Sequence, residues 1–157
     1  MYKGYYQSPI GLIEIISDED SITALSFVEE ASDAHAAVAP DVLQTALQQI
    51  EEYFQGKRRE FQLSLGARGT GFQEQVWKQL REVPYGETAC YGDIAAKIGN
   101  AKASRAVGGA NNKNKIAIIT PCHRIVGADG SLTGYAGGLW RKEWLLQHEK
   151  ANKYNSK

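Results

Sequence analysis

Three residues with reactive or ionisable side chains, Cys122, His123 and Arg124, follow directly after an apolar run and a proline. The thiolate is the nucleophilic form of cysteine, and neighbouring cations stabilise it relative to the neutral thiol. A histidine can take the thiol proton, directly or through a water, when a carboxylate orients its ring, and Glu149 is a candidate for that carboxylate. The motif therefore predicts a nucleophilic cysteine with a basic partner. The alternative is an inert core cysteine, which is the commoner situation after a buried strand.

The residues before this cysteine should position it. Residues 116–120 have the composition of a short buried strand, which would present Cys122 at its end. No second cysteine or histidine stands at the spacing of a zinc site, so we expect no bound metal. Cys90 could form a disulfide with Cys122, but a cysteine pair in a cytosolic protein is more often reduced.

A helix-turn-helix pattern lies upstream of the cysteine. Residues 94–98 and 103–111 predict two short helices about a turn that contains Gly99. Arg105 is the only long side chain near the start of the second helix, and small residues follow it: Ala106, Val107, Gly108, Gly109 and Ala110. Glycines inside a helix cost about 1 kcal/mol each relative to alanine, which indicates a close approach to another backbone. Two neighbours would fit this small face, the minor groove of DNA or another helix of the same protein.

The charges are unevenly distributed along a chain whose net charge is +0. Residues 94–128 contain no acidic residue, but they include the cations Lys97, Lys102, Arg105, Lys113, Lys115 and Arg124. The acidic residues gather in the first third of the chain. A basic face on a neutral protein fits the phosphates of a nucleic acid, although a solvated basic surface without a partner gives the same pattern.

The composition excludes other classes of protein. The chain has 157 residues, of which 43% are hydrophobic and 23% charged, as in a globular protein of one domain or two small ones. No run approaches the ~20 apolar residues that span a bilayer. The first residues also lack the basic and apolar regions of a secretory signal. We therefore expect a cytoplasmic monomer without a membrane partner.

The hydrophobic pattern changes at residues 66–71, a short stretch with three glycines. The elements expected before it are an antiparallel meander over residues 2–7, 12–17 and 22–28, a helix from Asp41 closed by Gly56, and a short strand over residues 61–65. After it, Thr70 and Gln73 form a capping box for a helix. The expected fold class is α+β: a scaffold domain of a small antiparallel sheet and a helix, residues 1–68, followed by a mostly helical domain with the helix-turn-helix, residues 69–157.

Taken together, these motifs resemble the O6-alkylguanine-DNA alkyltransferases, also called methylated-DNA–protein-cysteine methyltransferases. The resemblance runs from about Phe72 to Glu149, and its segments stand in the family's order: residues 83–88, Tyr91, residues 105–110, the cysteine motif at 121–126, residues 134–139 and residues 142–146. Residues 1–68 resemble the family only in length and element content. Proline is frequent in the family where this chain has Gly71 and Lys115.

The resemblance implies a role for each matching residue. Cys122 would accept the alkyl group, with His123 and Glu149 as its proton relay and Asn114 as a bridge from the helix-turn-helix. Tyr91 would rotate the damaged nucleotide out of the duplex and donate a proton to the leaving guanine. Arg105 would fill the gap that this nucleotide leaves in the base stack. The implied DNA contacts are Tyr91, Arg105, Ala106, Gly108, Gly109 and Arg124, and the implied lesion pocket comprises Ile125, Tyr135, Ala136 and the backbone of Cys122.

The implied reaction moves an alkyl group from O6 of guanine, or from O4 of thymine, in double-stranded DNA to Cys122, without a cofactor. The thioether product has no good leaving group, so the thiol is not regenerated and each molecule reacts once. The alternative is a non-catalytic protein that binds alkylated DNA, against which the presence of Cys122 argues. A transcriptional regulator would need a further cysteine-rich domain, and a cysteine protease would separate its cysteine and histidine in the sequence.

Overall fold

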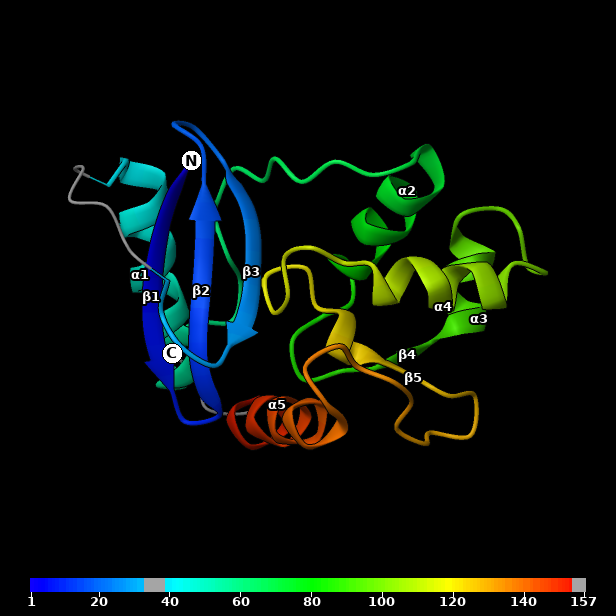
Figure 1. Cartoon of the computed structure of the whole chain (residues 1–157). Helices are drawn as coiled ribbons and strands as arrows, with labels where there is room; N and C mark the ends of the chain where they lie inside the picture. The colour runs from blue at the N-terminus through cyan, green and yellow to red at the C-terminus, as the bar shows by residue number, and fades with distance from the viewer. Residues whose placement is uncertain (33–38, 154–157) are drawn as a thin grey trace. The chain divides into compact units, whose positions relative to one another are not determined.

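The computed structural model describes residues 1–32 and 39–153, and the chain forms two compact units (Figure 1). The N-terminal unit is Met1–Arg68, and the C-terminal unit begins at Gly69. The first contains a three-stranded sheet and a helix, and the second is mostly helical. The expected α+β fold class is confirmed.

An antiparallel sheet of three strands in the order β1-β2-β3 forms the first half of the N-terminal unit. Its strands are β1 (Tyr2–Ser8), β2 (Gly11–Ser17) and β3 (Ile22–Val28). Side chains alternate between the two faces of a strand, so Ile13 and Ile15 of the central strand share one face, where both are fully buried. The predicted meander is confirmed.

Helix α1 (Asp41–Phe54) lies along one face of this sheet (Figure 1). Leu43, Ala46, Ile50 and Tyr53 recur at helical spacing, and all of them are buried. The backbone of Gly56 has a φ of 76°, which fits the left-handed residue after a helix and confirms the predicted end. The short strand expected over residues 61–65 is wrong. Within residues 61–65 only Leu65 makes a bridge, parallel to Ile22, and the backbone N–H of Gln62 donates to the side chain of Gln49.

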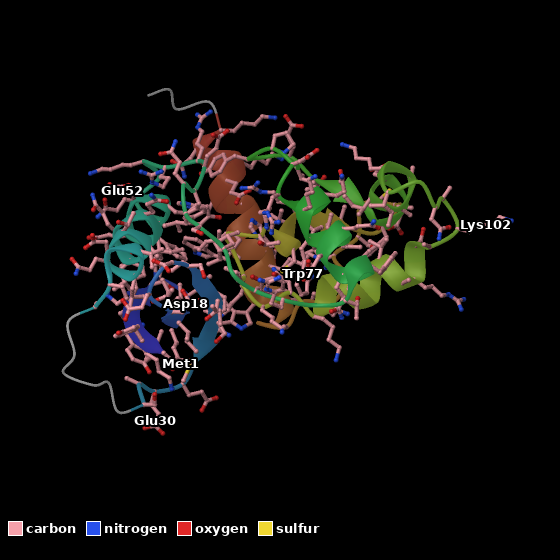
Figure 2. The ribbon with its side chains drawn as sticks, turned by 90° about the horizontal axis from the view of Figure 1, so that it is seen from above. Met1, Asp18, Glu30, Glu52, Trp77 and Lys102 are labelled. Carbon is pink, nitrogen blue, oxygen red and sulfur yellow. The ribbon has the colours of Figure 1, made fainter. Side chains whose placement is uncertain are left out.

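The C-terminal unit begins with α2 (Gly71–Leu80), and the predicted capping box is present. The Thr70 hydroxyl accepts from the backbone N–H of Gln73, and the Gln73 side chain accepts from the N–H of Thr70, each at 3.0 Å. Trp77 is labelled in Figure 2, and its indole N–H donates to the carbonyl of Ala110 at 2.9 Å. This bond joins α2 to the helix that contains Ala110.

Two short helices, α3 (Tyr91–Lys97) and α4 (Ser104–Asn112), pack on one another as the expected helix-turn-helix. The turn between them passes through Gly99 at a φ of +81°, a conformation that side chains other than glycine's rarely allow. Figure 2 shows Lys102 in the same turn, at its tip and directed away from the helices.

The last elements are a single turn of 3-10 helix, η1 (Cys122–Arg124), and the helix α5 (Leu139–Asn152). Strand β4 (Ala89–Cys90) pairs in parallel with β5 (Ile125–Val126), so the residues before α3 lie beside those after η1. None of the helices that the structure describes combines the length and the apolar character needed to cross a membrane.

Candidate active site

The apolar run before the cysteine is a series of turns, so the strand expected at residues 116–120 is wrong. The N–H of Ile119 donates to the carbonyl of Ala117 at 2.8 Å, which closes a γ-turn around Ile118 at a φ of 71°. A positive φ is costly for a β-branched side chain and is retained only where the surroundings enforce it. All of the run except the half-buried Ala117 is nevertheless buried, so apolar composition correctly indicated burial but not the backbone conformation.

The side chain of Asn114 holds these turns in place. Its carbonyl oxygen accepts from the backbone N–H of Ile116 at 3.1 Å, and its amide donates to the carbonyl of Thr120 at 2.8 Å. Asn114 also hydrogen-bonds the thiol of Cys122. One amide therefore links the end of the helix-turn-helix, the buried turns and the cysteine.

A second tight turn presents Cys122. Its N–H donates to the carbonyl of Thr120 at 2.8 Å across Pro121, whose φ of −82° and ψ of 68° are those of an inverse γ-turn. Cys122 then opens the 3-10 turn η1 and is only 7% exposed. The thiol is thus enclosed, and a group that reacts with it must enter the site.

His123 and Glu149 form the buried pair that the sequence predicted. The Nε2 atom of His123 lies 2.7 Å from a carboxylate oxygen of Glu149, and neither residue is exposed. Burial lowers the pKa of His123 in spite of its carboxylate partner, which favours the neutral imidazole. Burial alone would raise the pKa of Glu149, but His123 and Arg124 hold it well below its usual range. Nε2–H therefore donates to a carboxylate, and Nδ1 keeps a lone pair that can accept a proton.

Arg124 requires a correction. The sequence placed it among the DNA contacts, but it is only 5% exposed. Its guanidinium donates two bonds to Glu149, at 2.8 and 3.0 Å, and a third to the carbonyl of Val83 at 2.6 Å. A bidentate pair of this kind orients a carboxylate strongly. Arg124 therefore acts inside the protein, on Glu149, and not on phosphates.

The electrostatics of the thiol also differ from the expectation. Burial raises the pKa of Cys122, while the hydrogen bond of Asn114 and the charge of Lys142 act in the opposite direction. The two cations expected to stabilise the thiolate do not serve that purpose, since His123 is favoured as the neutral form and Arg124 is bound to Glu149. The raised pKa favours the protonated form of the resting thiol.

The lesion-pocket residues lie in different surroundings. Ile125 is fully buried in β5, directly after η1. The hydroxyl of Tyr135 is buried without a hydrogen-bond partner among the residues that the structure describes, and burial together with the nearby Cys122 raises its pKa well above the usual value. Ala136 is exposed in the loop that follows. The hydroxyl of Tyr135 is therefore held inside the protein, within the electrostatic influence of Cys122, and its role in a lesion pocket stays a prediction.

Tyr91 lies at the start of the helix-turn-helix, and Asn114 follows its end. Tyr91 is the first residue of α3, and its phenol hydrogen-bonds the hydroxyl of Thr133. A Cβ added at Gly108 would lie 3.6 Å from the side chain of Tyr91, an ordinary contact distance, so the phenol ring lies beside this position of α4. Sequence reasoning did not identify Thr133.

The face of α4 that the sequence assigned to DNA is open. Arg105 and Ala106 are exposed, and so is Gly109, where an added Cβ would meet nothing within 4 Å. Arg105 makes no hydrogen bond or ion pair with any residue that the structure describes. The opposite face, with Val107 and Ala110, is buried. Internal packing therefore explains Val107 and Ala110, whereas no residue that the structure describes would contact a side chain at Gly109.

Lys142 is a second residue that sequence reasoning missed. It is fully buried in α5, on the same face as Leu145 and Glu149. Those three positions follow the i, i+3, i+7 spacing of a buried helix face, which was the available signal. Within the described ranges, no three residues of the types that bind metals gather into a possible site.

Two family models match the chain. The DNA-binding domain of 6-O-methylguanine DNA methyltransferase matches residues 71–151, and the ribonuclease-like domain of the same protein matches residues 1–67. This chain belongs to the 6-O-methylguanine DNA methyltransferase family. Every predicted site residue of this methyltransferase chain lies inside the DNA-binding match, and His123, Glu149 and Arg124 are bonded to one another there.

Close relatives cover almost the whole methyltransferase chain. The methylated-DNA–protein-cysteine methyltransferase of Methanosarcina acetivorans is 48% identical over 154 residues, which are 95% of this chain and 98% of the relative. The crystal structure of the Mycobacterium tuberculosis O6-methylguanine methyltransferase is 44% identical, with a TM-score of 0.86 over 96% of this chain and 93% of that one. The M. tuberculosis protein in complex with DNA gives a TM-score of 0.88 at 45% identity, over 97% of this chain and 94% of that one.

Proposed function

We propose that this protein repairs double-stranded DNA by transferring an alkyl group from O6 of guanine to its own Cys122, once per molecule. The observation that carries the proposal is the buried arrangement in which Glu149 bonds Nε2 of His123 and His123 directly follows the enclosed Cys122. The family membership and the relatives named for this reaction support the same function.

The damaged base must leave the duplex to reach the thiol. A base inside the stack is inaccessible, and extruding it costs a few kcal/mol. The open face of α4 has small residues at Ala106 and Gly109 and the exposed Arg105 at its start. A small face suits the narrow minor groove, and Arg105 is long enough to occupy the space that the extruded nucleotide leaves. Tyr91 and Gly108 would line the path of the nucleotide.

Proton transfer and substitution follow from the site. The thiol proton passes to Nδ1 of His123, directly or through a water, which leaves a thiolate and an imidazolium that Glu149 stabilises. The sulfur attacks the alkyl carbon, the S–C bond forms as the C–O6 bond breaks, and the electron pair stays on the guanine. The guanine takes a proton from the phenol of Tyr91. The proton held by His123 then returns to the phenolate, so the thiol proton ends on the guanine.

The product explains why one molecule would react once. The alkylated sulfur is a thioether, from which water displaces nothing under ordinary conditions. The protein needs no methyl-donor cofactor because the DNA supplies the alkyl group. We further propose that residues 69–157 carry this chemistry and that residues 1–68 form a scaffold domain. We also propose that the protein is a cytoplasmic monomer.

Intact-protein mass spectrometry tests this function directly. The protein is mixed with a duplex oligonucleotide that contains O6-methylguanine, and the expected result is a gain of one methyl mass, at most one per molecule. Peptide mapping should place the methyl group on Cys122 and leave Cys90 unmodified. Turnover well beyond one equivalent, or modification of Cys90, would overturn the proposal.

The matched controls separate transfer from binding. Cys122→Ala should abolish the mass gain while it retains binding to the modified duplex, because the contacts of α4 do not involve the thiol. An unmodified duplex should give no mass gain with the wild-type protein. Binding of the modified duplex by wild-type protein without any mass gain would instead indicate a non-catalytic lesion-binding protein.

A further inference from the structure

Thr133 lies in the loop between β5 and α5, and the reaction proposed above assigns it no role. The residue is half-buried, whereas its neighbours Leu132 and Gly134 are exposed. Its hydroxyl bonds the phenol of Tyr91 at the start of α3. Its backbone carbonyl accepts from the ammonium group of Lys142 in α5, at 3.1 Å. Thr133 therefore connects two helices of the site through this loop.

Lys142 fixes the backbone of Thr133. The lysine is fully buried, and a buried ammonium group needs hydrogen-bond acceptors, because its removal from water is costly. The carbonyl of Thr133 is the one acceptor of this ammonium group among the residues that the structure describes. The loop is also closed on itself before Thr133, since the N–H of Gly127 donates to the carbonyl of Ser131 at 2.9 Å. Both contacts restrict where the hydroxyl of Thr133 can lie.

The phenol of Tyr91 is held at its ring and at its hydroxyl. A Cβ added at Gly108 would lie at contact distance from the ring, so the ring lies beside α4. Within the described ranges, the phenol hydroxyl has a single hydrogen-bond partner, which is the hydroxyl of Thr133. The two residues are 42 positions apart in the sequence, so the fold alone brings them together. The direction in which the phenol points therefore depends on Thr133.

The hydrogen bond between these two hydroxyls can run in either direction, and the proposed reaction needs one of them. A phenol that donates to Thr133 has no proton free for the guanine, whereas a phenol that accepts from Thr133 keeps its own proton available. When the guanine takes that proton, Thr133 donates to a phenolate, and a hydrogen bond to a charged acceptor is stronger than one to a neutral acceptor. The bond strengthens as the proton leaves, which favours the transfer.

We propose that Thr133 is a positioning residue for the proton donor. Its hydroxyl donates to the phenol oxygen of Tyr91 and directs the phenol proton toward the leaving guanine, while Lys142 holds the backbone of Thr133 in place. The proposal rests on the proposed function, in which Tyr91 protonates the guanine. Thr133 keeps its own proton throughout, so the thiol proton still ends on the guanine.

Single-turnover methyl transfer from an O6-methylguanine duplex, followed by quenched-flow mass spectrometry, tests the proposal. Thr133→Val removes the hydroxyl but retains the branched shape and the carbonyl that Lys142 needs, and it should slow the transfer roughly tenfold. Thr133→Ser restores a hydroxyl and should recover most of the wild-type rate. Thr88→Val changes an exposed threonine just before β4 and should alter neither the rate nor the melting temperature. An unchanged or faster transfer in Thr133→Val contradicts the proposal.

A double-mutant cycle separates positioning from a general loss of structure. Tyr91→Phe removes the phenol hydroxyl itself and should slow the transfer by roughly 100-fold. In that background Thr133→Val should cause no further loss, because the group that it positions is already absent. Equal losses in both backgrounds would show that Thr133 supports only the fold, and the proposal would be abandoned. Thr133→Ala repeats the cycle with a smaller side chain if the valine variant does not fold.

A measurement without DNA distinguishes a failure of this proposal from a failure of the proposed function. In protein labelled with ¹³C at the Cζ atom of tyrosine, the NMR signal of Tyr91 is the one that Tyr91→Phe removes. That signal should shift in Thr133→Val and return toward its wild-type position in Thr133→Ser, because Cζ carries the phenol oxygen. An unshifted signal rules out the proposal whether or not the protein transfers methyl groups. If the signal shifts but the wild-type protein takes no methyl group from DNA, the proposed function fails and Thr133 remains the residue that holds the phenol.

Discussion

The Nε2 atom of His123 lies 2.7 Å from Glu149, and Nδ1 of the same ring has no hydrogen-bond partner among the described residues. The carboxylate fixes the ring and its tautomer, so the lone pair of Nδ1 is left for the thiol proton. Arg124 fixes the carboxylate in turn, through two hydrogen bonds. Substitutions at this pair should affect stability and reactivity together.

Glu149→Gln should both destabilise the protein and slow the transfer. The change leaves the Arg124 guanidinium buried without its anion, which costs about 3–5 kcal/mol of unfolding free energy. His123 also loses the partner that stabilises its protonated form, so single-turnover transfer should slow by roughly 100-fold. Urea unfolding and quenched-flow mass spectrometry measure the two effects. Glu143→Gln changes an exposed carboxylate of the same helix and should alter stability by less than about 0.5 kcal/mol.

Removing the charges of both Arg124 and Glu149 tests whether the instability of Glu149→Gln comes from an unpaired guanidinium. In the double variant Arg124→Met and Glu149→Gln, no unpaired charge is left, so part of the lost stability should return while the transfer stays slow. If the loss of unfolding free energy in the double variant equals the sum of the losses in the two single variants, this explanation is contradicted.

Stability should fall on the acid side in two stages. The pKa of His123 is lowered from its ordinary 6.5, so below pH 6.5 the unfolded chain binds a proton that the folded protein resists. The pKa of Glu149 is lowered from its ordinary 4.5, so a second loss begins below about pH 4.5. Urea unfolding from pH 8 to pH 4 should therefore show falling free energy, and a constant value between pH 7 and pH 5 would contradict the assignment.

The stability of the protein should also depend on pH in the alkaline range. The pKa of Cys122 is raised above its ordinary 9.0, so the unfolded thiol ionises first and stability should fall as the pH rises above 9. Cys122→Ala removes this contribution, and its stability should change less over the same interval. The comparison of the two proteins isolates the thiol from the tyrosines.

Arg105→Ala should slow repair of duplex DNA by roughly tenfold or more, because extrusion loses the side chain that fills the stack. Reaction with the free nucleobase O6-benzylguanine should stay near the wild-type rate, since a free base has no stack to leave. Lys113→Ala removes another exposed cation near the end of α4 and should slow the duplex reaction less. Equal rate losses on duplex DNA and on the free base would contradict the proposal that Arg105 fills the gap in the base stack.

Gly109 offers a separate test of the exposed face of α4. Gly109→Ala should stabilise the protein by up to about 1 kcal/mol, because the added Cβ meets nothing and alanine favours a helix. Gly109→Leu should also fold, but its side chain projects from the face proposed to enter the minor groove. Its affinity for duplex DNA, measured by fluorescence anisotropy, should fall by about tenfold or more relative to Gly109→Ala. Equal affinities would place this face away from DNA.

Local signals predicted much of the fold from the sequence. The capping box of Thr70, the left-handed residue Gly56 and the glycine-containing turn at Gly99 depend on neighbouring residues only, and all three occur where expected. The strand at residues 116–120 failed because its conformation depends on Asn114, whose side chain bonds the backbone of the run and bends it into turns.

The charged residues of the site show more clearly that a prediction from sequence fails where it depends on contacts made only in the fold. Arg124 and Lys142 look like surface cations in the sequence, and only the fold reveals that both are buried. Composition cannot tell a cation that binds phosphate from one that binds Glu149. The pairing of His123 with Glu149, in contrast, could be anticipated, because the family's motifs fix the two residue types and their order.

The short parallel pairing of β4 with β5 determines where this protein could tolerate additional residues. Ala89 pairs with Ile125 and Cys90 pairs with Val126, which makes a two-residue ladder of backbone hydrogen bonds. Tyr91 directly follows the first strand of this ladder, and Arg124 directly precedes the second. One residue inserted between positions 90 and 91, or between 124 and 125, would move the phenol or the thiol by about 3 Å along its strand. An insertion at residues 128–131, an exposed turn beyond the ladder, would leave both groups at their present separation. Fusion of a peptide tag or a reporter loop should therefore succeed at that turn and fail next to either strand.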